Sequence, residues 1–210
     1  MKTHTPPRQA SRSAPWISRI SAGGRTGGVT LEVRVAVAED AEQVALLHTD
    51  SWRRFYRGAF SDSYLDGDVL SDRRTVWTAR LTEPSHSATV VVQDGAGIAG
   101  FVHVILDNDD RWGSFVENLH VRHDLQRAGL GRVLLSRAAE AVAEGAKDRR
   151  MYLWVLEQNT NAQGFYAAMG GVCVEKSLVS PPGGVPDRLN GTPGKLRIAW
   201  ADVAISELTL

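Results

Sequence analysis

Apolar and polar residues alternate near the start of the chain. Between 29 and 37 every second position is valine or leucine, the period of a half-buried strand. The pattern then changes to a helical period that brings Val44 and Leu47 onto one face and runs to about residue 52. Asp40 with Gln43 three residues later offers a capping pair at the start of that helix. We therefore predict a strand followed by a helix.

The remaining pattern predicts further strands and helices that alternate along the chain. Proline and glycine positions separate them, and a hairpin turn is expected at 94–97. The expected order is β-α-α-β-β-β-α-β-α-β-β, an α/β fold with about seven strands and about four helices. The segments after the first helix are a helix at 72–81, strands at 88–93, 98–106 and 114–121, a helix at 130–145, a strand at 151–156, a helix at 161–169, a strand at 172–178, a loop at 180–194 and a strand at 195–200.

Residues 1–28 differ in composition from the rest. They hold three prolines, several serines and glycines, and basic residues with no acid before Glu32. Such a segment cannot bury enough apolar surface to offset the ordering of the chain. We expect a flexible basic tail or a misplaced start codon, in preference to a transit peptide, and a single domain at 29–210.

Charge, hydropathy and cysteine content limit the classes of binding partner and the cellular location that we expect. The 210 residues carry 24 Lys and Arg against 24 Asp and Glu, so no basic field for nucleic acid is expected and a small molecule is favoured. No window reaches the roughly 20 apolar residues of a membrane helix, so no membrane partner is expected. The single cysteine, Cys173, leaves no intrachain disulfide and predicts a cytoplasmic protein; its apolar neighbours predict a packed thiol.

Gln-Arg-Ala-Gly-Leu-Gly at 126–131 joins the strand at 114–121 to the next helix. Its two glycines let backbone amides approach a ligand where a helix begins, which suits phosphate oxygens, although a tight turn without a ligand explains them equally. Leu134 stands where a Rossmann fingerprint needs a small residue, and Arg132 where a Walker A loop needs lysine. A nucleotide-binding oxidoreductase is therefore disfavoured.

This loop, with the predicted element order, resembles the GCN5-related N-acetyltransferase (GNAT) superfamily. A second block agrees, since the strand near 153–157 is followed by Asn-x-x-Ala-x-x-Phe-Tyr at 159–166 and by two glycines. Ser-Trp-Arg-x-x-Tyr-Arg-Gly at 51–58 is similar to a mostly uncharacterised bacterial branch. The resemblance covers about 29–200 and implies a single-domain fold whose fourth and fifth strands are splayed around acetyl-CoA. His120 replaces a common tyrosine, which bears on the acceptor.

The resemblance implies a set of contacts to acetyl-CoA, with no metal. Amides of the glycine loop would hold the pyrophosphate, and the strand at 114–121 would pair with the pantetheine arm through its backbone. Asn159 would hold that arm, although an ordinary helix N-cap accounts for it too. The expected cofactor-binding residues are Leu119, His120, Val121, Gln126, Arg127, Ala128, Gly129, Leu130, Gly131, Arg132, Asn159 and Phe165.

Two residues are expected to carry the proton transfers. The resemblance implies that Tyr166 protonates the departing thiolate, whereas on its own such a tyrosine is usually core. Glu117, a carboxylate inside an apolar strand, is the candidate base that takes the proton of the amine, directly or through water. His120, placed on the opposite face by strict alternation, is the second candidate for that base.

The resemblance implies that the segment from the end of the first helix to the second walls the acceptor site, where its aromatic and acidic residues would suit a cationic amine. The same residues are also explained if the aromatic side chains pack at the edge of the hydrophobic core and the acidic ones lie in a solvent-exposed turn. The expected substrate-binding residues are Trp52, Tyr56, Tyr64 and Asp66, together with Phe55, Asp62 and Asp68.

We expect an acetyl-CoA-dependent N-acetyltransferase that acts by direct attack of a primary amine. The acceptor stays open among aminoglycosides, polyamines, amino acids, and protein N-termini or lysines. A non-catalytic acyl-CoA-binding sensor is the alternative, and a homodimer stays open because members of the family often dimerise.

Overall fold

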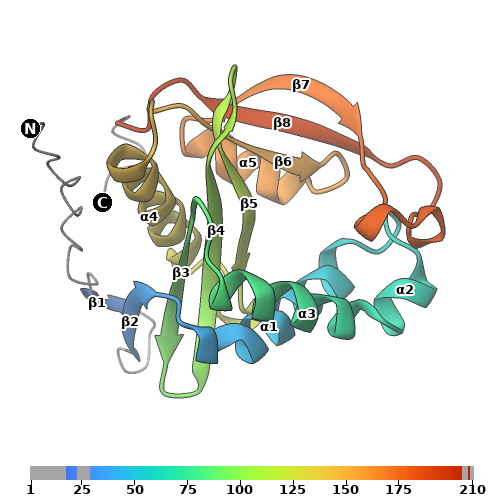
Figure 1. The fold of residues 1–210 in the computed structure, drawn as a ribbon, viewed down its shortest axis with the longest axis horizontal. Coiled ribbons are helices and arrows are strands. Elements are labelled where there is room, and N and C mark those ends of the chain that lie inside the picture. The colour runs from blue at the N-terminus through green and yellow to red at the C-terminus, as the bar shows by residue number, and fades with distance from the viewer. Residues whose placement is uncertain (1–17, 23–28, 205–207, 209–210) are drawn as a thin grey trace, which may run out of the picture.

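The computed structural model describes residues 18–22, 29–204 and 208. In these ranges one mixed sheet of eight strands runs in the order β1-β2-β3-β4-β5-β6-β8-β7 (Figure 1). The strands are β1 Ser18–Ala22, β2 Val29–Val35, β3 Ser87–Asp94, β4 Gly97–Asp109, β5 Gly113–Val121, β6 Met151–Leu156, β7 Val172–Leu178 and β8 Gly194–Trp200. The α-helices are α1 Ala41–Phe55, α2 Asp62–Asp66, α3 Val69–Thr82, α4 Leu130–Gly145 and α5 Thr160–Ala168.

The two faces of β4 are covered by different helices. Val102 and Val104 of β4 belong to a core that includes Leu134 and Leu135 of α4. Phe101, which points the other way, packs with residues of α1 and α3. Alternating side chains of one strand therefore serve two layers, and the single-domain α/β fold is confirmed (Figure 1).

The sheet opens between its fourth and fifth predicted strands, which are β5 and β6. The two run parallel but pair at only two positions, Ser114 with Met151 and Phe115 with Tyr152. β5 then continues to Val121 along β4, while β6 continues to Leu156 along β8. Among the described residues, no strand pairs with their facing edges beyond these two pairs, as the splayed arrangement requires.

Local details differ from the pattern-based expectations. Residues 18–22, assigned to a flexible tail, form β1 and pair antiparallel with β2; the other residues of that tail lie outside the described ranges. Gln43 does not cap α1, because its Oε1 accepts from the Ile98 amide of the β3–β4 hairpin at 3.0 Å. Asp40 instead binds the Val37 amide and Arg34. Tertiary partners have replaced the local capping pair.

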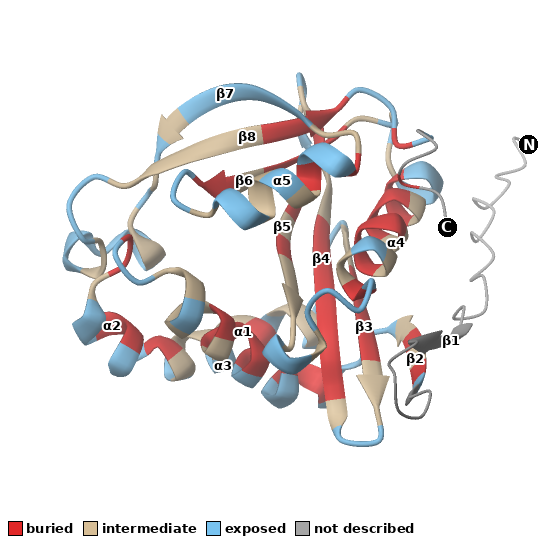
Figure 2. Cartoon of the chain, turned by 180° about the vertical axis from the view of Figure 1, so that it is seen from behind, coloured by how far each residue is buried: buried red, intermediate tan, exposed pale blue. Residues whose placement is uncertain are grey.

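The strand β7 is the exposed edge of the sheet. Val172 and Leu178 are about 60% exposed, at 61% and 60%, and the Cys173 thiol is exposed as well (Figure 2). The prediction of a packed thiol is therefore wrong: in the described part of the chain β7 pairs with β8 on one side, and exposed residues alternate along both of its faces, so neither face is covered. Among the described helices, none is long and apolar enough to cross a membrane.

Candidate active site

The glycine loop bends the chain sharply between β5 and α4. Arg127 and Gly129 both adopt left-handed backbone conformations, with φ of 63° and 86°. Gly129 is the N-cap of α4 and has no side chain that could accept from the amides of the first turn. Those amides and the positive end of a 16-residue helix are therefore presented to a ligand.

Gly131 lies close to another helix, so a side chain here would press on it. A Cβ built at this position would lie 3.3 Å from Cζ of Phe165, which α5 supplies. The two sequence blocks, the glycine loop and the Asn-to-Tyr segment, thus meet across the gap between β5 and β6. Gly129 needs glycine for a different reason, since nothing lies within 4 Å of its Cβ position and only its φ is restrictive.

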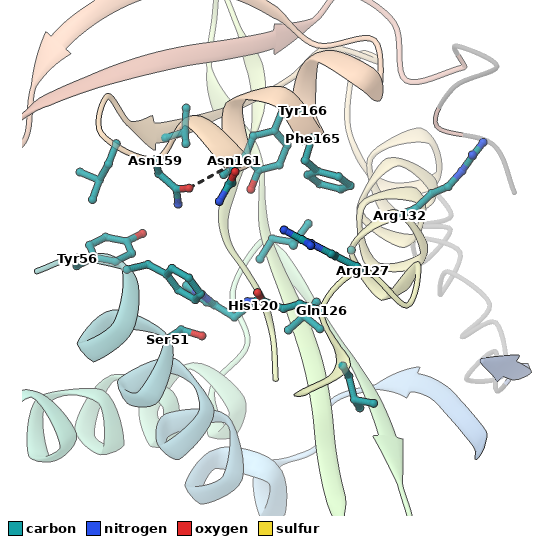
Figure 3. Close-up of a pocket in the computed structure, with 18 of the residues that line it drawn as sticks. Ser51, Tyr56, His120, Gln126, Arg127, Arg132, Asn159, Asn161, Phe165 and Tyr166 are labelled. Atoms are coloured by element: carbon teal, nitrogen blue, oxygen red, sulfur yellow. Dashed lines mark hydrogen bonds between the residues drawn. The ribbon is translucent and has the colours of Figure 1, made fainter. Parts of the chain in front are cut away.

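A cavity of about 560 Å³ lies at the split between β5 and β6. It reaches from the glycine loop past α5 to the C-terminal half of α1 (Figure 3). Residues from the expected cofactor set that line it are Leu119, His120, Val121, Gln126, Arg127, Gly129, Gly131, Arg132, Asn159 and Phe165. Ala128 and Leu130 of that set do not line the cavity. Leu130 is the first residue of α4, and its side chain is buried in the core.

Asn159 caps α5 and also lines the cavity. Its Oδ1 accepts from the Ala162 amide at 3.1 Å, which makes it the N-cap of α5. It also lines the cavity, and its side-chain amide nitrogen is not used by the cap (Figure 3). Capping and ligand contact are compatible here.

Tyr166 and Tyr56 line the far part of the cavity. Burial raises the pKa of Tyr166 well above its usual value, and the neighbouring Tyr56 adds to the shift. Burial likewise raises the pKa of Tyr56, to about 12. Both phenols are therefore protonated at any working pH, and each can donate a proton or a hydrogen bond.

A β-bulge in β5 decides where Glu117 and His120 point. Asn118 pairs with His103 of β4, but Val116 pairs with the next residue, Val104, so Glu117 is the extra residue between them. The bulge resets the alternation. Glu117 contacts Arg80 of α3, and the His120 ring lies 4.6 Å from that of His48 of α1, so both face the same helical layer. The expectation of opposite faces is wrong for this reason.

Glu117 does not line the cavity. Its carboxylate forms an ion pair of 2.6 Å with Arg80 and accepts from the Asn118 side-chain amide at 2.9 Å. His120 does line the cavity, and burial, with the nearby charge of Arg73, lowers its pKa to about 3. His120 is thus neutral at pH 7 and has an unprotonated ring nitrogen.

His48 backs His120 from inside the protein. Nε1 of Trp77 donates to Nδ1 of His48 at 3.0 Å, so the neutral ring of His48 carries its proton on Nε2. Burial lowers the pKa of His48 far below its ordinary value, with a further contribution from His120. The ring packed against His120 is therefore fixed in tautomer and uncharged.

Comparison with known proteins agrees with this geometry. The family model described as "Acetyltransferase (GNAT) family" matches residues 47–170, from α1 to the end of α5. The chain belongs to the GNAT acetyltransferase family. It is 30% identical over 130 residues to the uncharacterized N-acetyltransferase YuaI of Bacillus subtilis (strain 168), which covers 60% of this chain and 72% of that protein. As a GNAT protein it is an acetyl-CoA-dependent acyltransferase.

Solved structures share the fold. The PaiA N-acetyltransferase from Thermoplasma acidophilum, solved with coenzyme A, superimposes with a TM-score of 0.59 at 17% identity and covers 81% of this chain and 99% of its own. The putative acetyltransferase yncA from Salmonella typhimurium, solved with acetyl-CoA, gives a TM-score of 0.56 at 17% identity over 81% and 92%.

Of the expected acceptor residues, Tyr56 and Phe55 line the cavity, whereas Trp52, Tyr64 and Asp66 do not. Trp52 stacks on Tyr56 with ring centroids 5.3 Å apart and so stands one layer behind the wall. The Tyr64 hydroxyl donates to Asp72 at 2.9 Å, and Asp66 is paired with Arg57. The exposed Asp62 is also paired with Arg57, and Asp68 is exposed before α3.

Several cavity residues were not expected from the sequence. β6 contributes Trp154, Val155 and Leu156, which the apolar pattern marks only as strand. Asn161 and Ala162 follow the Asn159 cap and could have been found by their position at the start of α5. The remaining lining residues that sequence reasoning missed are Ser51 and Leu125.

Proposed function

We propose that this GNAT protein moves an acetyl group from acetyl-CoA to a primary amine by direct attack, without a covalent enzyme intermediate. One observation carries the proposal: a single cavity joins the glycine loop, which suits phosphates, to a protonated tyrosine and a neutral histidine. One end of the cavity suits the phosphates of the acetyl donor, and the other end has groups that suit the proton transfers of the reaction.

The residues present fit acetyl-CoA. The amides at the start of α4 suit the pyrophosphate, and Arg127 and Arg132 at the cavity wall add positive charge. The open edge of β5 at Leu119 and Val121 suits the amides of the pantetheine arm, which would pair with it as an added strand does. Acetyl-CoA supplies the thioester, whose acetyl carbon the amine attacks.

Tyr166 supports the proposal at the sulfur. Its hydroxyl keeps its proton at neutral pH and can give it to the thiolate that leaves when the carbon–sulfur bond breaks. Protonation matters only as negative charge develops, so the contribution of this hydroxyl is to the rate and not to ground-state binding.

We assign the proton of the amine to His120 in preference to Glu117. His120 lines the cavity and is neutral, so it can accept a hydrogen bond from the amine as the new carbon–nitrogen bond forms; because burial lowers its pKa to about 3, it passes the proton of the amine on to water and does not keep it. Glu117 is held by Arg80 outside the cavity wall and could act only at a distance. Of the two bases that the sequence offered, we therefore prefer His120 to Glu117.

A non-catalytic acyl-CoA sensor is the alternative. It would need the loop and the open strand edge but neither His120 nor Tyr166, and so the presence of both favours turnover. The test is release of free coenzyme A thiol from acetyl-CoA with and without a panel of primary amines. Amine-dependent release is expected; tight binding of acetyl-CoA without release on any amine would favour the sensor.

A cytoplasmic location follows from the lone, unpaired cysteine as a proposal, because an exposed thiol persists in a reducing compartment. Acceptors that are small molecules or peptides suit a cavity of this size. A homodimer stays a prediction.

A further inference from the structure

The acidic residues expected at the acceptor site are paired with arginines of the protein. Asp62 and Asp66 both pair with Arg57, and Glu117 pairs with Arg80. None of these three carboxylates lines the cavity. Among the described residues, the charged groups that do line it are two arginines and no carboxylate. A cationic group of an acceptor would therefore enter the cavity without an ion-pair partner in its described wall.

Cations of the protein also lie over the two indole rings on this side. Nζ of Lys195 lies 4.5 Å from the centroid of the Trp154 ring, and Cζ of Arg197 lies 4.6 Å from it. Trp52, behind the cavity wall, has the guanidinium of Arg73 over its ring at 4.5 Å. A further cation on either ring would meet a like charge that is already in place.

The cavity wall on the side of α1 is apolar. Trp154 and Leu156 of β6 share a face, because side chains two positions apart in a strand point the same way. Tyr56, which follows the last residue of α1, packs against the hydrophobic cluster that contains Leu156. Phe55, the last residue of α1, lines the same cavity. We call these four residues the apolar wall; in Figure 3 its Tyr56 lies at the opposite end of the site from Arg132.

Positive charge is disfavoured at the reacting end as well. Burial, together with the charge of Arg73, lowers the pKa of His120 to about 3. An ammonium group beside that ring would experience the same burial and the same charge. The reacting amine can respond by losing its proton, as attack requires. A second ammonium group on the acceptor would also have to lose its proton, or else remain in the cavity as an unpaired charge.

We propose that the acceptor is a primary amine with a single basic nitrogen on an apolar body, and that this body packs on the apolar wall. Polyamines and aminoglycosides carry further ammonium groups, so the same contacts disfavour them. This inference rests on the proposed acetyl transfer and adds the substrate class to it.

The test compares two acceptors of equal chain length that differ in one charge. Hexylamine ends in a methyl group where 1,5-diaminopentane has a second ammonium group. We expect wild type to prefer hexylamine by about 10–100-fold in kcat/KM, through a lower KM. 2-Phenylethylamine should be acetylated as well, and spermidine should be a poor acceptor.

Variants of Phe55 test where the body binds. Phe55→Glu places a carboxylate in the cavity wall, so kcat/KM should rise for 1,5-diaminopentane and fall for hexylamine. Phe55→Gln, of equal size and without charge, should weaken the use of hexylamine and not improve that of the diamine. Leu46→Glu adds the same charge to α1 at a position that is 46% exposed and outside the cavity, and it should keep the wild-type preference.

Calorimetry on the complex with coenzyme A separates this inference from the proposed function. Hexylamine should bind that complex more tightly than 1,5-diaminopentane, by a similar factor. The inference is overturned if the diamine is bound or acetylated equally well, if neither hexylamine nor 2-phenylethylamine is bound, or if a folded Phe55→Glu variant keeps the wild-type preference. Release of coenzyme A thiol with any other primary amine would still support acetyl transfer, whereas binding of acetyl-CoA without release on any amine would contradict it.

Discussion

Arg80 holds the carboxylate of Glu117 in an ion pair of 2.6 Å, on the same face of the sheet as His120 but outside the cavity wall. The β-bulge at Glu117 brings the two residues onto that face. The ion pair with Arg80 gives the carboxylate of Glu117 a structural role. Of the two residues, only His120 lines the cavity, with a neutral imidazole.

We expect Glu117→Gln to keep turnover within about tenfold of wild type, because Glu117 does not line the cavity and glutamine has nearly the same shape. The substitution removes the ion pair with Arg80. The cost should appear as a loss of about 1 kcal/mol in the free energy of unfolding, the scale of a partly exposed ion pair. His120→Asn should instead lower kcat by about 10²–10⁴-fold, the range for a lost general base. A large loss in Glu117→Gln with normal turnover in His120→Asn would reverse the assignment.

Tyr166→Phe should lower kcat by about 10–10³-fold and leave the dissociation constant of acetyl-CoA nearly unchanged, because the hydroxyl acts only when the sulfur becomes a thiolate. Tyr152→Phe is the matched control. Its hydroxyl is bonded to Asn108 and it does not line the cavity, so turnover should persist. Full activity of Tyr166→Phe would make Tyr166 a core residue and assign the proton to water or another group.

Gly129→Asp and Gly131→Asp should each weaken acetyl-CoA binding by at least tenfold in calorimetry. A carboxylate at the start of α4 repels phosphate, Gly129 adopts a φ of 86° that disfavours a side chain, and a Cβ at Gly131 presses on Phe165. Gly95→Asp in the β3–β4 turn, where nothing lies within 4 Å of the Cβ position, should bind normally. Unchanged affinity in both loop variants would argue against this phosphate site.

Acid should destabilise the protein through its buried histidines. Burial lowers the pKa of His103 and of His120 to about 3, whereas the unfolded chain protonates histidine near the ordinary value of 6.5. Between about pH 6.5 and 3 the unfolded state therefore binds more protons, and the free energy of unfolding falls as pH falls. One pH unit below 6.5, each such histidine costs about 1.4 kcal/mol.

Urea unfolding at pH 7.5 and 5.5 checks this dependence. His103→Gln removes one buried imidazole that is bonded to Thr89, so the loss of stability on acidification should be smaller than in wild type. His123→Gln, at an exposed position before the glycine loop, is the control and should keep the wild-type loss. Equal losses in wild type and His103→Gln would show that His103 titrates normally in the folded state.

The elements and the glycine loop at one end of the cavity could be predicted because they depend on local signals. The period of apolar residues marks each strand and helix, and Gly129 and Gly131 mark a junction that few other residue types can form. Asn159 could be predicted as either cap or ligand contact because an Asn before a helix has the chemistry for both.

The acceptor half could not be predicted because it depends on long-range contacts. The extra residue in β5 places Glu117 on the same face of the sheet as His120. The pattern of apolar and polar residues within the strand does not indicate this bulge. The sequence around Asp66 does not show whether its carboxylate is free to bind a cationic substrate or already forms an ion pair. Only the folded structure shows that Arg57 pairs with it. The exposure of Cys173 likewise follows from the position of β7 at the edge of the sheet.

The most direct test follows the acetyl group itself. Acetyl-CoA that is isotopically labelled in the acetyl group is incubated with the protein and a panel of primary amines, and the products are separated by mass spectrometry. We predict that the label appears on an amine nitrogen, in proportion to the coenzyme A released, and that Tyr166→Phe slows this appearance without changing its site. Label that stays on bound acetyl-CoA, or that appears only as free acetate, would contradict the assignment of amine acetylation.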